Sequence, residues 1–183
     1  GYQRMACGKS LAIVDAGPPP ATPYSAHAHS SVLAFEFSYK KQRIFVNCGS
    51  GAGDSPISTD LARMTRTTAA HTALVISNIN SAQIRKDGLI GRAAETTSYV
   101  RQEGPQGIWL EAGHNGYERR VGLHQKRRLF LSQDGLDLRG EDMLSAASNR
   151  PRISAIGTHD VDIRFHLHPD VEATPTQDGE AAI

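Results

Sequence analysis

The stretch Ser25-Ala-His-Ala-His-Ser-Ser-Val-Leu-Ala-Phe-Glu-Phe-Ser38 joins two closely spaced histidines to an alternating apolar segment. Side chains of a β-strand point to one face at every second residue, so this pattern places His27 and His29 on the face of Phe35 and Phe37. Because the phenylalanines need a core, we expect the imidazoles at the mouth of that core, on the same strand. Histidines in such a place can bind a metal, transfer protons, orient an anion or form hydrogen bonds at the rim.

Short alternating or apolar runs recur along the whole chain between turn signals. The predicted strands are Leu11–Asp15, Val32–Tyr39, Arg43–Asn47, Ala73–Ser77, Ile108–Glu111, Arg127–Ser132, Leu136–Arg139 and Val161–His168. Lys40-Lys-Gln42 and Asp134-Gly135 each separate two of these runs and predict hairpins. Helical periodicity is scarce, and the two candidates are Ser58–Met64 and Asp142–Ala147. Many short strands with few helices predict an all-β fold, an antiparallel two-sheet β-sandwich.

The length of 183 residues suits one domain with a substantial core. We assign this domain to residues 1–172 and expect the polar tail 173–183 to fray. Twenty Lys and Arg residues balance 19 Asp and Glu residues, and no apolar run approaches the roughly 20 residues of a membrane helix. We therefore expect neither nucleic acid nor membrane as a partner. Two cysteines, Cys7 and Cys48, are too few for a disulfide framework.

Two later segments also carry polar side chains at predicted strand ends. Asn47 ends the strand Arg43–Asn47, which would bring it close to His29 if the first hairpin forms. His71 stands just before the apolar run Ala73–Ser77. The sequence therefore predicts a composite site built from three separate segments.

Other charged and histidine-rich segments have a plain structural interpretation. Basic residues cluster at Arg119-Arg120 and Lys126-Arg127-Arg128, with Arg63 and Arg66 upstream. Such clusters are usually solvated, and contact with an acidic polymer is the functional alternative. Alternation along Val161–His168 predicts a core face of Val161, Ile163, Phe165 and Leu167. His166 and His168 should then point away from the core.

Taken in order, these motifs resemble the C-terminal β-sandwich domain of the heparinase II/III-like polysaccharide lyases. The resemblance rests on His27-x-His29 before Phe35-Glu-Phe37, Val46-Asn-Cys-Gly49, Ala70-His71, His114-Asn-Gly-Tyr117, the strand Lys126–Leu131, Arg139-Gly-Glu-Asp142 and Arg164-Phe-His-Leu-His-Pro169. It runs over nearly the whole chain, which makes it more specific than any single motif.

The resemblance implies a reaction and a set of site residues. Such lyases cleave uronic-acid polysaccharides by β-elimination, which requires a neutralised carboxylate, removal of the C5 proton and protonation of the departing O4 oxygen. It implies His27 as the catalytic residue, and His29, Asn47 and His71 as the ligands that hold zinc in zinc-containing members. His114 and Tyr117 are candidate substrate-binding residues, although the Asn-Gly between them is first a turn signal.

The chain departs from the family pattern at three positions. Ser31 stands where relatives commonly have Asp, Asn47 replaces a zinc-binding carboxylate, and Thr72 follows His71 where Asn is frequent. A neutral amide contributes no charge and is a poorer zinc ligand than a carboxylate. Both a zinc-bound site and a site without cofactor therefore stay open.

The resemblance also implies partners. These are an acidic polysaccharide, such as a glycosaminoglycan or alginate, and an N-terminal helical toroid of the same parent chain, which would supply the other wall of the cleft. Because the chain begins with Gly1, we interpret it as a piece of a longer bacterial protein, inactive in isolation. The parent would be periplasmic if it carries a signal peptide and otherwise cytoplasmic.

One alternative is a non-catalytic carbohydrate-binding or scaffolding sandwich with a decayed site. A free-standing zinc hydrolase is a weaker one, because no clear carboxylate base accompanies the histidines.

Overall fold

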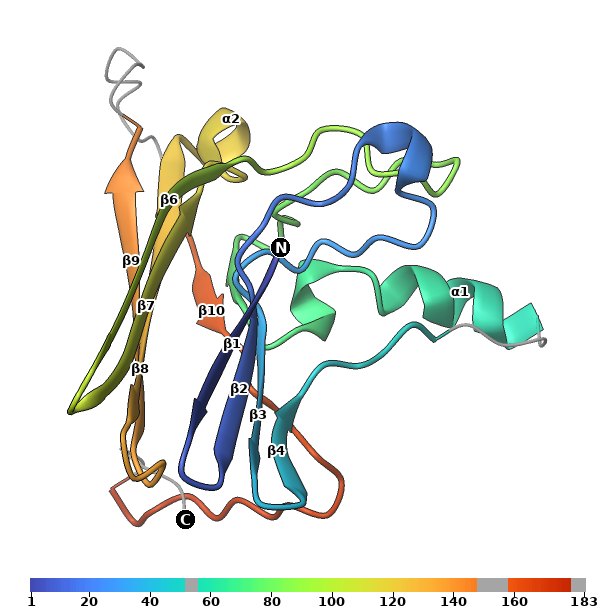
Figure 1. The fold of residues 1–183 in the computed structure, drawn as a ribbon. Coiled ribbons are helices and arrows are strands. Elements are labelled where there is room, and N and C mark those ends of the chain that lie inside the picture. The colour runs from blue at the N-terminus through green and yellow to red at the C-terminus, as the bar shows by residue number, and fades with distance from the viewer. Residues whose placement is uncertain (52–55, 148–157, 179–183) are drawn as a thin grey trace.

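Two antiparallel sheets face each other in the computed structural model, which describes residues 1–51, 56–147 and 158–178 (Figure 1). One sheet has the order β1-β2-β3-β4-β11, with β1 (Tyr2–Cys7), β2 (Ser10–Asp15), β3 (Phe35–Tyr39), β4 (Gln42–Val46) and β11 (His166–Leu167). The other has the order β6-β7-β8-β9, with β6 (Thr96–Gly104), β7 (Gly107–His114), β8 (Leu123–Ser132) and β9 (Leu138–Ala146). A two-stranded sheet pairs β5 (Leu74–Ile76) with β10 (Val161–Ile163). The predicted all-β sandwich is confirmed.

The core lies between the two large sheets, because alternate side chains of each strand turn inward. Its buried apolar residues are Met5, Cys7, Ala12, Val14 and Phe35 from one sheet and Ile108, Leu110, Leu129 and Leu131 from the other. Each large apolar side chain removed from water contributes about 1.5–3 kcal/mol. Both predicted hairpins are confirmed, since β3 pairs with β4 and β8 with β9. This packing gives the loops above the sheets a rigid base.

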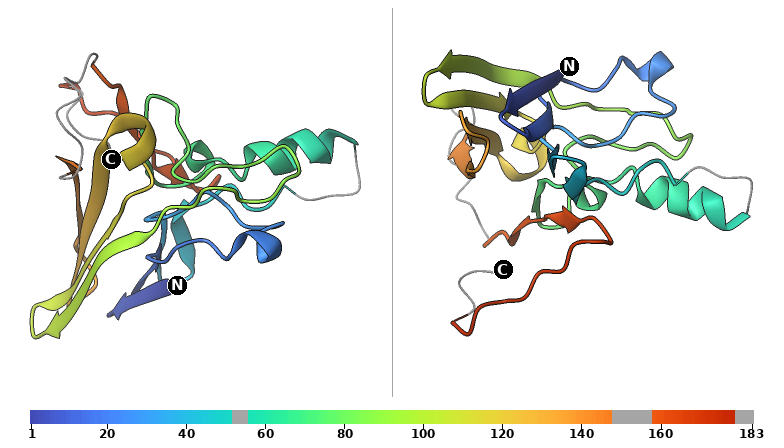
Figure 2. Two further views of the ribbon diagram at one scale, coloured as in Figure 1. Left: turned by 90° about the horizontal axis from the view of Figure 1, so that it is seen from above. Right: turned by 60° about the horizontal axis from the view of Figure 1, so that its bottom comes forward.

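Helices lie outside the sheets. They are η1 (Thr22–Tyr24), α1 (Pro56–Met64), η2 (Thr68–Ala70) and α2 (Glu118–Val121), and α1 projects away from the sandwich (Figure 2). The predicted helix Ser58–Met64 is confirmed within α1. None of the helices in the described ranges is long and apolar enough to cross a membrane. The predicted helix Asp142–Ala147 is wrong, because Asp142 to Ala146 belong to β9 and pair with β8. Pairing across the sheet decides the structure of this short segment.

The strand that carries the apolar residues begins at Phe35, later than predicted. His27 and His29 lie in a turn and loop before it, so they share no strand face with Phe35. The alternation stops because Leu33 has a φ of +65°, a left-handed conformation that no strand continues. Its N–H donates to the Asp15 carbonyl oxygen at 2.7 Å. The prediction of histidines on a strand is therefore wrong, although they do lie near its start.

The predicted strand Val161–His168 is two short strands in different sheets. β10 pairs with β5, whereas β11 pairs with β4. Val161, Ile163 and Phe165 are exposed, and the His166 side chain turns inward to donate from Nε2 to the Ala69 carbonyl oxygen at 3.0 Å. The predicted core face is therefore formed only in part: Phe165 still packs on the rings of Phe35 and Phe45, whereas His166 turns inward against the prediction. The chain changes partner strand between the two halves, which breaks the regular alternation. Of the predicted tail, residues 179–183 lie outside the described residues, and the boundary at 172 stays a prediction.

Candidate functional site

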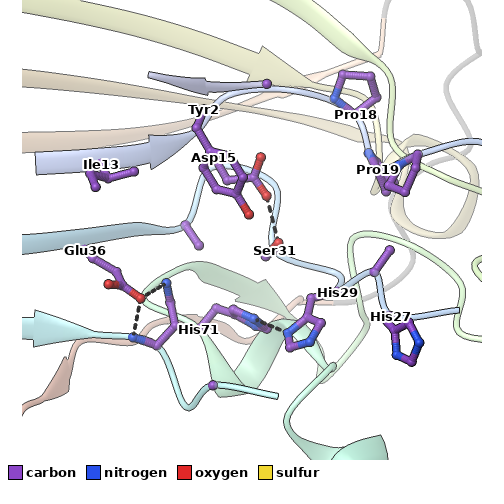
Figure 3. A pocket seen from close by; sticks show the side chains of 16 residues that line it. Tyr2, Ile13, Asp15, Pro18, Pro19, His27, His29, Ser31, Glu36 and His71 are labelled. Carbon is purple, nitrogen blue, oxygen red and sulfur yellow. Dashed lines mark hydrogen bonds between the residues drawn. The ribbon is translucent and has the colours of Figure 1, made fainter. Parts of the chain in front are cut away.

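A cavity of about 430 Å³, which we call the histidine pocket, opens beside the ends of β2 and β3 (Figure 3). His27, His29, Asn47 and His71 all line it. They come from the loop before β3, the end of β4 and the segment before β5, the three segments predicted to form one site. The structure therefore brings the four residues together around one pocket, while their chemical roles stay predictions.

His29 and His71 form a hydrogen-bonded pair at the base of the pocket. The Nδ1–H of His71 donates to the Thr67 carbonyl oxygen at 2.7 Å, so its Nε2 carries the lone pair. That nitrogen lies 3.0 Å from Nδ1 of His29, which must then be the donor. Burial lowers the pKa of His71 to about 4 and also lowers that of His29. Both rings are therefore neutral near pH 7, and their hydrogen bonds fix the tautomer of each.

His27 differs from this pair because its side chain is exposed at the edge of the histidine pocket. It also lines a second hollow of about 280 Å³ between α1, the histidine loop and residues 84–88. We call this hollow the basic depression, because Arg63, Arg66 and Lys86 line it. Arg66 holds the histidine loop by donating to the carbonyl oxygens of Ala28 at 2.7 Å and Ser25 at 3.1 Å. His27 thus stands between a pocket of neutral imidazoles and a group of cations.

Asn47 fastens two of the three segments together. Its Oδ1 accepts the N–H of Thr72 at 3.0 Å, and its Nδ2 donates to Glu36 Oε1 at 3.1 Å. The Thr72 hydroxyl in turn donates to the Val46 carbonyl oxygen at 3.1 Å. The amide is therefore engaged at both ends, and it holds the His71 segment against the end of β4.

Asp15 is a pocket residue that the sequence pattern did not reveal. The Ser31 hydroxyl donates to its Oδ2 at 2.8 Å, and burial raises the pKa of this carboxyl. A carboxylate from the end of β2 therefore lies next to Ser31, the position at which the family resemblance implies Asp. The only sequence signal was the place of Asp15 at the end of a predicted strand, which is shared by many structural residues.

Arg127 is the second residue that the pattern missed, and its interpretation as part of a solvated basic cluster is wrong. Its side chain is 3% exposed and pairs with Asp142, with Nη2 to Oδ2 at 2.7 Å. Its Nη1 also donates to the carbonyl oxygens of Leu33 at 2.8 Å and Thr72 at 3.0 Å. These carbonyls belong to the segments that carry His29 and His71. Arg127 therefore ties both segments of the site to the opposite sheet.

His114 and Tyr117 are placed differently from the predicted substrate-binding role. Both side chains are fully buried. His114 accepts the Gly116 N–H on Nδ1 at 3.0 Å and donates from Nε2 to Gln125 Oε1 at 2.9 Å. The Tyr117 hydroxyl donates to the Leu74 carbonyl oxygen at 2.7 Å. Neither side chain is exposed in this structure, and their predicted role in substrate binding stays a prediction.

The donor atoms of the predicted zinc set fit hydrogen bonding better than zinc. The imidazole nitrogens of His29 and His71 face each other, and Asn47 Oδ1 already accepts the N–H of Thr72. No group of three or more His, Cys, Asp or Glu side chains suited to a metal occurs within the described ranges. Zinc sites in proteins use three or four nitrogen, thiolate or carboxylate ligands. The residues present therefore do not fit the zinc site of the zinc-containing members.

Comparison with known sequences agrees with this architecture. The chain matches the family described as heparinase II/III-like, C-terminal, over residues 1–183. It is also 34% identical over 189 aligned positions to FtsZ-localized protein C of Caulobacter vibrioides, and the match covers 100% of this chain and 32% of that protein. The chain thus spans about a third of the length of this relative.

Solved structures show the same fold. A heparinase III, the BT4657 gene product, superposes with a TM-score of 0.68 at 18% identity over 97% of this chain and 24% of its own. A mutant of the heparan sulfate lyase HepC from Pedobacter heparinus gives a TM-score of 0.51 at 20% identity over 68% of this chain and 17% of its own. With a family match over its full length and this shared fold, the chain belongs to the heparinase II/III-like C-terminal family, whose members are homologous to polysaccharide lyases.

Proposed function

We propose that this chain forms one wall of the catalytic cleft of a polysaccharide lyase that cleaves uronic-acid polysaccharides by β-elimination. One observation carries the proposal: the exposed imidazole of His27 stands between the histidine pocket and the basic depression. A histidine can accept and donate a proton near neutral pH. The adjoining cations suit the carboxylate whose charge must be neutralised before the neighbouring proton becomes acidic.

The proposed chemistry assigns a task to each side of His27. The uronate carboxylate lies against Arg63 and Lys86, neither of which has an ion-pair partner among the described residues. The C5 proton leaves to a base, the C4–O4 bond breaks, a C4=C5 double bond forms and O4 takes up a proton. His27 takes part in one of these proton transfers. The other comes from the part of the cleft that the preceding domain of the parent chain supplies.

We further propose that the wall works without zinc. The hydrogen bond between His29 and His71, together with the Asn47 bridge to Thr72, already holds the loop of His27 in place. Metal analysis of the purified full-length protein should then find zinc well below one ion per chain, and activity should survive treatment with a chelator. An equimolar zinc content, lost together with activity on chelation, would contradict this part of the proposal.

The lyase proposal is tested with the full-length protein on heparan sulfate, alginate and related polymers, read by the absorbance of the unsaturated uronate. His27→Ala should lower kcat/KM by about 10²–10⁴-fold, as expected for loss of a general acid or base. His159→Ala is the matched control, because His159 is also exposed and lines none of the cavities described above. Equal activity of both variants would remove His27 from the mechanism.

A second candidate is a non-catalytic carbohydrate-binding or scaffolding sandwich. The observation that favours it is the 34% identity of this chain to a protein known as FtsZ-localized, together with the departures at Ser31 and Asn47. This candidate predicts that the full-length protein binds at least one acidic polymer of the panel and degrades none. Cleavage of any polymer that depends on His27 would exclude it.

A further inference from the structure

A third cavity, of about 330 Å³, lies between α2 and the segment 80–95, outside the histidine pocket and the basic depression. We call it the arginine cavity, because Arg92, Arg119 and Arg120 line it. We propose that it is a second subsite for an acidic polysaccharide and that it holds an anionic sugar residue away from the one at His27. This inference rests on the proposed function for the identity of the polymer, but the cavity itself is argued from its own side chains.

The cations of this cavity are free to bind a ligand. Within the described residues, the side chains of Arg92, Arg119 and Arg120 form no ion pair and no hydrogen bond with the protein. Six other arginines do pair with carboxylates, namely Arg85, Arg101, Arg127, Arg128, Arg139 and Arg164. Guanidinium groups bind carboxylate and sulfate oxygens through pairs of N–H donors. Three unpaired guanidiniums around one hollow therefore favour an anionic ligand.

The carboxylates of the cavity are already engaged. Glu118 Oε2 lies 3.1 Å from Nε2 of His124, and Glu95 Oε2 accepts the Asn115 Nδ2–H at 3.4 Å. They therefore do not neutralise the arginines through direct pairs. Carboxylates beside arginines also suit a sugar, because they accept hydrogen bonds from hydroxyl groups while the guanidiniums hold the acid group.

The remaining lining is polar and held in place. The backbone N–H groups of Thr68 and Glu95 donate to Asn80 Oδ1 and Asn115 Oδ1, at 3.0 and 2.8 Å. A Cβ at Gly116 would lie 2.3 Å from the Ser81 carbonyl oxygen, so the turn before α2 packs directly on the segment 80–95. Ala93 is the one apolar side chain among the lining residues. An amide-rich, prearranged hollow of this kind fits a hydroxylated ligand and not an apolar one.

One hairpin-like loop, residues 83–92, joins this cavity to the basic depression, and its two arms are paired through backbone hydrogen bonds. The N–H of Gln83 donates to the Arg92 carbonyl oxygen at 2.8 Å, and that of Arg85 to the Leu89 carbonyl oxygen at 2.9 Å. The turn of this loop, with Lys86, lines the basic depression. Its open end, at Gln83 and Arg92, lines the arginine cavity. In Figures 1 and 2 the segment runs from α2 toward the side of the molecule that carries η1 and α1.

The distance between the two ends of this loop suits one polymer chain. Three to four residues of extended backbone separate the turn from the open end, which is roughly 10–13 Å. One acidic polysaccharide chain of a few sugars can therefore contact both cationic hollows at once. The two hollows then act as linked sites, and the gain in affinity should appear only for ligands long enough to reach both.

The test uses the full-length protein and measures the binding of disaccharides and octasaccharides. Oligomers of alginate carry carboxylates only, whereas those of heparan sulfate carry sulfates as well, so the two series separate the anion types. Replacing Arg92, Arg119 and Arg120 together by Gln should weaken octasaccharide binding at least about tenfold and flatten its salt dependence. Disaccharide affinity at the His27 end should change less than about twofold. The matched control replaces Arg4, Arg43 and Arg139 by Gln, which removes the same charge outside the three cavities.

The outcomes separate this inference from the lyase proposal. Loss of long-ligand affinity in the cavity variant alone supports it, whether or not the parent cleaves the polymer. Unchanged octasaccharide affinity, an equal loss in the control variant, or failure of the unmodified protein to bind either oligomer series would overturn it. Equal affinity for a single-stranded oligonucleotide of matched charge would also overturn it, because the cavity would then respond to charge alone.

Discussion

His71 and His114 are two buried histidines whose pKa values are lowered alike, but whose ring nitrogens have different hydrogen-bond partners. Burial lowers the pKa of each to about 4. His71 donates from Nδ1 to a carbonyl oxygen, which turns its Nε2 toward His29 and the histidine pocket. His114 accepts a backbone N–H on Nδ1, which turns its Nε2–H toward Gln125 inside the protein. The lowered pKa therefore reflects burial in both residues. The direction of Nε2 distinguishes them: in His71 it faces the histidine pocket, and in His114 it faces the protein interior.

The surroundings of His114 and the histidine pocket are joined by one chain of contacts. Gln125 Nε2 donates to Asp142 Oδ1 at 3.0 Å, Asp142 pairs with Arg127, and Arg127 reaches the carbonyl oxygens of Leu33 and Thr72. The Arg127 guanidinium also lies 5.4 Å from the centre of the Phe35 ring. The buried contacts of His114, Gln125, Asp142 and Arg127 therefore position the histidine pocket. Substitutions among the buried residues should lower stability, whereas substitutions in the pocket should lower activity.

The largest effect on stability is expected for Asp142→Asn. The change leaves the Arg127 guanidinium buried without its charge partner, which costs about 3–5 kcal/mol of unfolding free energy. Urea unfolding at neutral pH measures it. Glu141→Gln is the control, because Glu141 pairs with Arg128 at 3.2 Å on an exposed face, and should cost less than about 1 kcal/mol. Similar costs for both variants would show that the buried pair is no anchor of the site.

A smaller effect is expected from pH through His114. The ordinary pKa of histidine is 6.5 and that of His114 is about 4, so below pH 6.5 the unfolded chain binds the extra proton. Its contribution to stability is therefore complete above that pH and is lost as the pH falls toward 4. Between about pH 7.5 and about pH 5 the loss should reach about 2 kcal/mol. In urea titrations, His114→Gln should remove this share of the slope; an unchanged slope would refute the assignment.

The smallest effect is expected for Tyr117→Phe. The substitution removes the buried hydroxyl that donates to the Leu74 carbonyl oxygen, which should cost about 1–2 kcal/mol. Activity of the full-length protein should stay the same, because the Tyr117 side chain is buried away from the three cavities. Tyr99→Phe removes a hydroxyl bonded to Gln3 on the surface and should change stability by less than about 0.5 kcal/mol. A loss of activity in Tyr117→Phe without a loss of stability would restore Tyr117 as a substrate contact.

Much of the sandwich was predictable because period-2 alternation is a local signal. The strands ending at Asp15 and Ser132 follow from such runs, and Asp134-Gly135 marks its hairpin with the residues that the turn requires. β1 and β6 were missed, since their sequences, Tyr2–Cys7 and Thr96–Gly104, mix polar and apolar residues at the sheet edges. β1 and β6 become strands because they pair with β2 and β7. The local sequence of a segment does not reveal which strand it will pair with.

The site was predictable in part of its membership and not in its geometry. His29, Asn47 and His71 share a pocket as expected, because Asn47 directly follows β4 and the two histidines lie in the segments that lead into β3 and β5. The loop conformation around His27 was not predictable, since it depends on Leu33 at positive φ and on Arg66 donating to loop carbonyls from far along the chain. Arg127 was missed for the same reason: its partners Leu33, Thr72 and Asp142 lie in other segments of the chain.

The most direct test of the central claim compares His27→Gln with His114→Gln in the full-length protein, with kcat/KM measured on a cleaved polymer and normalised to the folded fraction. The exposed histidine should carry the chemistry and the sealed one only the fold. His27→Gln should therefore lose about 10²–10⁴-fold in kcat/KM with unchanged stability, whereas His114→Gln should lose stability and keep its activity per folded molecule. Full activity of His27→Gln, or an equal loss in both variants, would contradict the account.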